Sequence, residues 1–115
     1  MVPVRDKEII AREEVSVRLR VGHLLRVSGY LTGASLFMWS GHARTEVAMG
    51  MAEASVRGHG PGGAGGPDED LLRKLRDLLK EARWYLASGD FPAGAARMRV
   101  AEDLVALRIV SLSGE

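Results

Sequence analysis

The 115-residue chain lacks cysteine, asparagine and glutamine altogether, and it holds only two residues each of Phe, Trp and Tyr. The absence of cysteine excludes disulfide bonds and thiolate chemistry and fits a reducing compartment, so we expect a cytoplasmic protein. The missing amides and the excess of 13 Arg over 3 Lys are thermophile-like, although a GC-rich genome produces the same arginine bias. With so few aromatic rings, a core must consist mainly of Leu, Val, Ala and Met.

An excess of charge of one sign is also missing, since 16 basic residues face 15 acidic ones. The chain therefore has no bulk attraction to nucleic acid or to a membrane surface. Its best apolar run, residues 24–39, is interrupted by Arg26, Ser28, Gly29 and Thr32, and is too short and broken to span a bilayer. The N-terminus lacks the apolar centre of a signal peptide. We expect a single domain without membrane contact.

One segment is rich in glycine, with the sequence RGHGPGGAGGP at residues 57–67. Such dense glycine holds neither a helix nor a strand, and the segment lacks the motif of a phosphate-binding loop. It predicts a flexible linker between two helical hairpins, at about residues 5–55 and 68–112.

A similar phrase occurs in both hairpins, as RVSGYLTGAS at 26–35 and LASGDFPAGA at 86–95. With an offset of 60, Gly29 matches Gly89, and we expect both glycines to form the corner between two antiparallel helices. The first helix then ends at Ser28. Its expected inward face consists of Ala11, Val15, Leu19 and Gly22. The alternation at 15–21 favours a strand instead, but no other segment offers a partner strand.

The second hairpin has clearer boundaries. Pro67 and the acidic run that follows it are typical of a helix start, and Asp90 with Pro92 predicts the start of the next helix. The fold class we predict is all-α, a four-helix bundle of two antiparallel hairpins. The expected inward positions of the last two helices are Leu71, Leu75, Leu78, Ala82 and Tyr85, followed by Met98, Ala101, Val105, Ile109 and Leu112.

The expected second helix, residues 30–52, is apolar on two sides. One stripe, predicted to be core, contains Met38, Thr45, Met49 and Ala52. A helix that is apolar nearly all round is buried on more than one side. We therefore predict a homodimer, with the alternative that another helix of the same chain covers the second stripe. That second, uncharged stripe is Leu36, Trp39, Ala43, Val47 and Gly50.

No catalytic, cofactor or metal site is legible, so we expect a non-enzymatic interaction module. His42 and Glu46 have a spacing that can present two metal ligands, but no third ligand accompanies them and the pair is interpreted as helix support. Three arginines of the expected first helix, Arg18, Arg20 and Arg26, form with Arg12 a basic strip that could bind phosphate. The alternative is that this strip pairs with acidic residues of the protein.

The second hairpin carries a resemblance in the segment LLKEARWYLASGDFPAGAARMRVAEDLVAL at 78–107. It resembles the helical hairpin of the HEPN superfamily, small archaeal members included, and it is similar to a tetratricopeptide hairpin. The HEPN resemblance implies a dimeric, nucleotide- or RNA-associated domain, such as a partner of nucleotidyltransferases or a toxin. RNA-cleaving members carry an Arg, then four to six residues, then a His late in the domain, where this chain has Arg97, Arg99 and Arg108 and no His. Only Arg18 and His23 have that spacing, so the resemblance assigns no catalytic residue.

Overall fold

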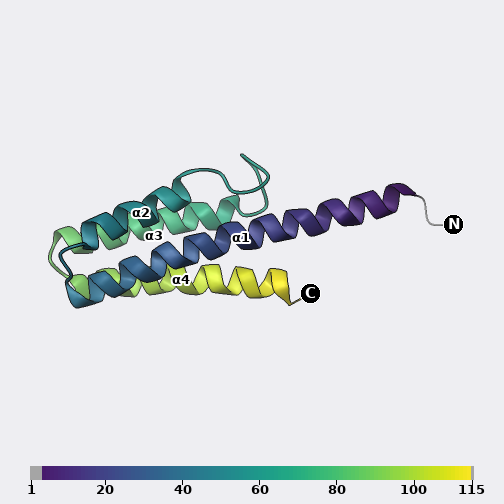
Figure 1. Ribbon diagram of the computed structural model, residues 1–115. Coiled ribbons are helices and arrows are strands. Elements are labelled where there is room, and N and C mark those ends of the chain that lie inside the picture. Colours follow the sequence, from purple (N-terminus) through teal and green to yellow (C-terminus); the bar gives the residue numbers. More distant parts are fainter. Residues whose placement is uncertain (1–3, 115) are drawn as a thin grey trace.

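The computed structural model describes residues 4–114, with side chains from Ser16 onward. It contains four helices, α1 (Val4–Ser40), α2 (Thr45–Arg57), α3 (Glu69–Ala87) and α4 (Phe91–Ser113), and the described residues include no strand (Figure 1). The predicted all-α bundle is therefore confirmed. Residues 15–21 are helical, so the strand alternative for this segment is wrong.

Each helix packs against its neighbour in sequence, and α1 also packs against α4, which closes the ring. The two short turns lie at one end of the bundle and the α2–α3 loop lies at the other (Figure 1). With 37 residues, α1 is about 55 Å long at 1.5 Å per residue, and its amino-terminal part runs past the other three helices. The molecule is accordingly elongated, with extents of 64 × 25 × 18 Å.

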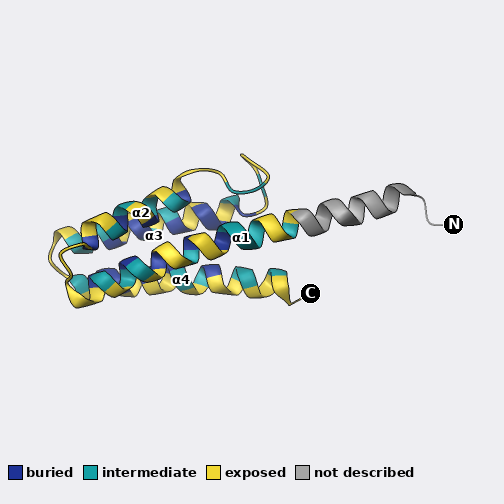
Figure 2. Ribbon diagram, in the orientation of Figure 1, coloured by how far each residue is buried: buried dark blue, intermediate teal, exposed yellow. Residues whose placement is uncertain are grey.

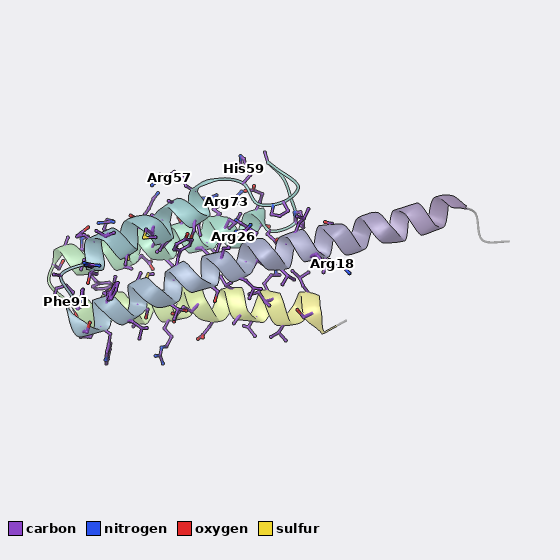
Figure 3. All side chains as sticks on the ribbon, viewed as in Figure 1. Arg18, Arg26, Arg57, His59, Arg73 and Phe91 are labelled. Atoms are coloured by element: carbon purple, nitrogen blue, oxygen red, sulfur yellow. The ribbon has the colours of Figure 1, made fainter. Side chains whose placement is uncertain are left out.

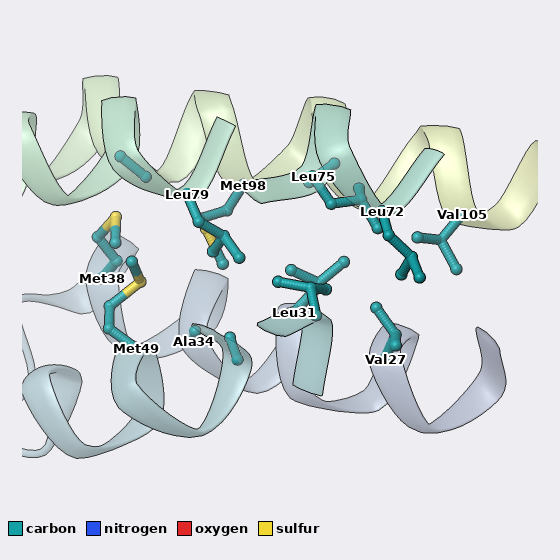
Figure 4. Packing of buried hydrophobic residues seen from close by; sticks show 14 of the residues in the cluster. Val27, Leu31, Ala34, Met38, Met49, Leu72, Leu75, Leu79, Met98 and Val105 are labelled. Carbon is teal, nitrogen blue, oxygen red and sulfur yellow. The ribbon is translucent and has the colours of Figure 1, made fainter. Parts of the chain in front are cut away.

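The core follows helical spacing on all four helices, because positions three and four apart share one face (Figures 2 and 4). Nine of the ten predicted inward residues of α3 and α4 are confirmed, with Leu78, Ile109 and Leu112 partly buried at the edge of the core. The tenth, Tyr85, is partly buried but does not belong to the core cluster. The buried apolar residues are Leu24, Val27, Leu31, Ala34 and Met38 on α1; Met49, Ala52 and Val56 on α2; Leu71, Leu72, Leu75, Leu79 and Ala82 on α3; and Ala95, Met98, Ala101 and Val105 on α4.

The predicted corner at Gly29 is wrong, because α1 continues through this residue to Ser40. The chain turns instead at Gly41, whose φ of 65° matches the φ of 79° at the correctly predicted Gly89. After Gly89, the Asp90 carboxylate accepts a hydrogen bond from the Ala93 N–H at 3.2 Å and starts α4. Nothing comparable follows Gly29, so the helix runs on.

The predicted boundaries of the first two helices are therefore wrong, because α1 ends at Ser40 and α2 begins at Thr45. Leu19, placed on the inward stripe, is 57% exposed, and Gly22 is only partly buried. Ala11 and Val15 lie outside the residues whose side chains are described. The four predicted core residues of the second helix are all buried, but they lie on two different helices. Met38 is in the last turn of α1, while Thr45, Met49 and Ala52 belong to α2.

Helix α4 approaches α1 and α3 closely at Gly94, which is buried. A methyl group on Gly94 would lie 2.5 Å from Met38 Sδ and 3.2 Å from the Ala82 carbonyl oxygen. Only glycine fits this crossing without a shift of its neighbours. The contact between Gly94 and Met38 therefore joins the two hairpins at the end of the bundle where the short turns lie.

The α2–α3 loop, predicted as a flexible linker, is folded into turns. The N–H of Gly63 donates to the Gly60 carbonyl, and the N–H of Gly66 donates to the Gly63 carbonyl, both at 3.0 Å. The loop lies against α1, where a methyl group on Gly60 would be 3.2 Å from His23 Nδ1. His59 is exposed and lies 2.5 Å from a Glu69 carboxylate oxygen. Hydrogen-bonded turns and the approach to His23 thus define the path of the loop between α2 and α3.

Candidate interaction surfaces

A groove of about 340 Å³ lies between the end of α1 and the start of α4. Leu36 and Trp39 of α1 line it, and they are 67% and 69% exposed. Its α4 side is built from Ala95, Ala96 and Arg99. We call this feature the Trp39 groove. Large exposed apolar side chains beside a depression lined by small residues are typical of a surface that binds a protein.

The other three residues of the predicted dimer stripe lie elsewhere. Ala43 is in the exposed turn before α2, while Val47 and Gly50 are on α2, which packs against α1 and α3 and has no place in the Trp39 groove. Val47 is 64% exposed. The stripe was read from one continuous helix, and the break at Gly41 divides it between two surfaces.

The predicted phosphate-binding strip is also divided, because Arg20 is engaged inside the protein. Its Nε and Nη2 donate to the two carboxylate oxygens of Asp68, at 3.0 and 2.8 Å. Arg108 Nη1 donates to the same carboxylate at 2.7 Å. Arg18 and Arg26 are exposed on α1 (Figure 3), and Arg12 lies outside the described side chains.

Asp68 is the central charge of this buried cluster, since its side chain is only 1% exposed. The hydrogen bonds from Arg20 lower the pKa of Asp68, and Arg108 lowers it further, against the opposing effect of burial. The same contact raises the pKa of Arg20. Asp68 stands at the start of α3, but its side chain makes no capping bond and instead ties that helix to α1 and α4.

A second ion cluster joins α2 to α3 through Arg83. Its Nε and Nη2 donate to the Glu53 carboxylate at 2.8 and 2.5 Å, and its Nη1 donates to Glu46 at 2.6 Å. These hydrogen bonds, above all those to Glu53, raise the pKa of Arg83. Glu46 is therefore paired with Arg83 and not with His42, whose Nδ1 accepts the Arg44 N–H at 2.9 Å in the turn.

Two further observations concern the chemistry that the described residues can support. No group of three or more His, Asp or Glu side chains among them is arranged to hold a metal ion. Within the same part of the chain, none of the helices combines the length and apolar character needed to cross a bilayer. The described residues do form open grooves between the helices.

Comparisons of the chain with protein-family models, curated proteins and solved structures give no significant match.

Proposed function

We propose that the protein is a non-enzymatic, cytoplasmic interaction module that forms a homodimer through the Trp39 groove. The observation that carries this proposal is the pair Leu36 and Trp39, both about two-thirds exposed beside a groove with an alanine wall. Burial of such side chains contributes about 1.5–3 kcal/mol each when they leave water. In a monomer about two-thirds of each side chain remains in water, so most of this stabilisation is missing.

A two-fold contact suits this surface because the protruding side chain and the depression belong to the same patch. In a two-fold dimer, a residue that contacts a position on the partner is contacted by the same residue in return. Trp39 of each copy would enter the groove of the other and lie against Ala95 and Ala96. Arg99, at the edge of the groove, is in place to cover the face of the incoming indole ring, a favourable cation–π arrangement.

The test compares two tryptophans of similar exposure. Trp39→Asp places a charge in the interface and is expected to give a folded monomer, measured by sedimentation equilibrium and circular dichroism. Trp84→Asp is the matched control, because Trp84 is 65% exposed on α3 and lies outside the groove. A wild-type chain that is monomeric at high micromolar concentration contradicts the proposal, and so does a dimer that survives Trp39→Asp. Co-purification of wild type with a different protein would indicate another partner for the groove only if the Trp39 variant loses it.

The second candidate is the nucleotide- or RNA-associated role that the HEPN resemblance implies. It is supported by Arg18 and Arg26, which are exposed cations on α1. Arg20 adds little to such a site because Asp68 already accepts two of its hydrogen bonds. The Arg18→Ala/Arg26→Ala variant should weaken binding of a single-stranded RNA and reduce its salt dependence if this role is correct. RNA binding that the double variant leaves unchanged removes this candidate.

A further inference from the structure

Arg76 differs from the other arginines that the bundle partly buries. In the part of the chain with described side chains, four arginines are partly buried: Arg20, Arg76, Arg83 and Arg108. Arg20 and Arg108 share the carboxylate of Asp68, and Arg83 binds Glu53 and Glu46. Arg76 has no carboxylate within 4 Å among the described residues, and its Nη1 donates to the Val56 carbonyl at 2.8 Å. A partly desolvated cation without a counter-ion is unfavourable unless an anion is supplied.

Two more cations converge on the same place. A cavity of about 210 Å³ between α2 and α3 is lined by Arg57, Arg76 and Lys80, together with Glu53, Val56 and Leu79. Arg57 lies at the end of α2, beside the loop (Figure 3). Neither Arg57 nor Lys80 forms an ion pair within the described residues, so three positive groups from two helices share one small cavity.

Among the described residues, only one acidic side chain lines this cavity, against three cations. Glu53, the only carboxylate that lines it, has both oxygens occupied by Arg83. Asp77 lies on the α4 side of α3, where it lines a different cavity, and Glu81 pairs with Arg97 at 3.6 Å. Val56 and Leu79 add buried apolar walls, which strengthen the attraction of the cations for an anion.

We propose that the α2–α3 groove binds a phosphate-type anion, held by Arg57, Arg76 and Lys80. The Val56 carbonyl fixes the position of the Arg76 guanidinium, whose remaining N–H groups can donate to phosphate oxygens in its planar fork geometry. Arg57 and Lys80 supply further charge from opposite sides of the groove. The cavity is smaller than the roughly 300–1,000 Å³ of sites for larger ligands, so it takes a single phosphoryl group, free or carried by a larger molecule.

This site is independent of dimerisation, because the Trp39 groove lies between α1 and α4. The probes are inorganic phosphate and phenyl phosphate, titrated into the full ¹⁵N-labelled chain at constant ionic strength and followed by amide chemical shifts. The expected result is saturable shifts confined to the cavity, at about residues 53–57 and 76–80. Tighter binding of phenyl phosphate identifies an organic phosphate as the ligand class, whereas equal affinities identify the free anion.

Variants separate the site from general attraction to positive charge. Arg57→Gln/Lys80→Gln removes two cations that make no hydrogen bond in the described structure, so the fold is retained, and it should weaken binding about tenfold or more. Arg44→Gln/Lys74→Gln removes the same charge from exposed positions that do not line this cavity, and should leave the affinity within about twofold. Absence of saturable shifts at millimolar probe, shifts spread over all cationic positions, or an equal loss in the control variant overturns the proposal.

Discussion

The buried carboxylate of Asp68 allows a quantitative test of how the bundle is held together. Asp68 lies at the start of α3 and accepts two hydrogen bonds from Arg20 on α1 and one from Arg108 on α4. The substitution Asp68→Ala removes the carboxylate and leaves both guanidinium groups without an acidic partner. Three of the four helices therefore lose a shared contact in a single change.

The magnitude follows from the burial of the three groups. Removing one member of a buried ion cluster costs about 3–5 kcal/mol, because it leaves the remaining charge desolvated and unpaired. The Arg20 and Arg108 side chains are 16% and 33% exposed, so water can partly solvate them after the loss. We therefore expect Asp68→Ala to lower the free energy of unfolding by about 2–4 kcal/mol, a large part of the roughly 5–15 kcal/mol typical of a domain.

The assay is urea unfolding followed by circular dichroism at neutral pH, at a fixed protein concentration because a dimer would make stability depend on it. The exposed residue Asp103 on α4 supplies the control variant Asp103→Ala, for which we expect a change within about 0.5 kcal/mol. Arg20→Ala should cost more than Arg108→Ala, because Arg20 makes two of the three bonds and is less exposed. An Asp68→Ala loss below about 1 kcal/mol, with an unchanged denaturant slope, would refute this account of the cluster.

Two other predictions use the same measurement. Because folding lowers the pKa of Asp68 from its ordinary value of 3.8, its stabilising contribution is complete at neutral pH and is lost as the pH falls from about 5 through the folded pKa. Stability should therefore decline in acid, and Asp68→Asn should flatten that decline; equal slopes for the two proteins contradict the assignment. Gly94→Ala should destabilise the protein by about 1–2 kcal/mol, since the clash with Met38 Sδ and the Ala82 carbonyl exceeds the gain in helix propensity. A neutral or stabilising Gly94→Ala would show that α1 and α4 can separate there at little cost.

The second hairpin could be predicted from sequence because the residues at its turn are themselves typical of a helix end and a helix start. Asp90 and Pro92 are typical of a helix start, and Gly89 precedes them at the turn. The inward faces of α3 and α4 then follow from helical spacing alone, and every predicted position except Tyr85 lies in the core or packs against it.

The first hairpin could not be divided correctly from its Ser-Gly pair, because that dipeptide is ambiguous in this chain. Ser-Gly ends α1 at residues 40–41, follows α3 at 88–89 and ends α4 at 113–114, but at 28–29 it lies inside α1. The signal that distinguishes these positions is the apolar spacing on either side. Leu24, Val27, Leu31, Ala34 and Met38 continue one buried face across Gly29, whereas the next two positions of that face after Met38 are Gly41 and His42.

The candidate surfaces were predictable only in part, because they depend on which helices become neighbours. Leu36 and Trp39 could be identified from the sequence as uncharged positions, but the α4 residues that line the same groove are more than fifty positions away in the chain. The Arg20–Asp68 pair spans 48 residues, and the acidic run that contains Asp68 was interpreted as a helix start. The cavity around Arg76 likewise has no local sequence pattern.

The two glycines of the repeated phrase provide a direct test of this distinction. Nothing lies within 4 Å of where a methyl group would project from Gly29 or from Gly89, so packing does not decide the effect of alanine at either site. Gly29 is in the middle of α1, where alanine is favoured over glycine by about 1 kcal/mol. Gly89 has a φ of 79°, a left-handed conformation that costs an alanine about 1–2 kcal/mol. Gly29→Ala should therefore raise the urea midpoint and Gly89→Ala should lower it. If both substitutions shift the urea midpoint in the same direction, either the helical conformation at Gly29 or the left-handed conformation at Gly89 is wrong.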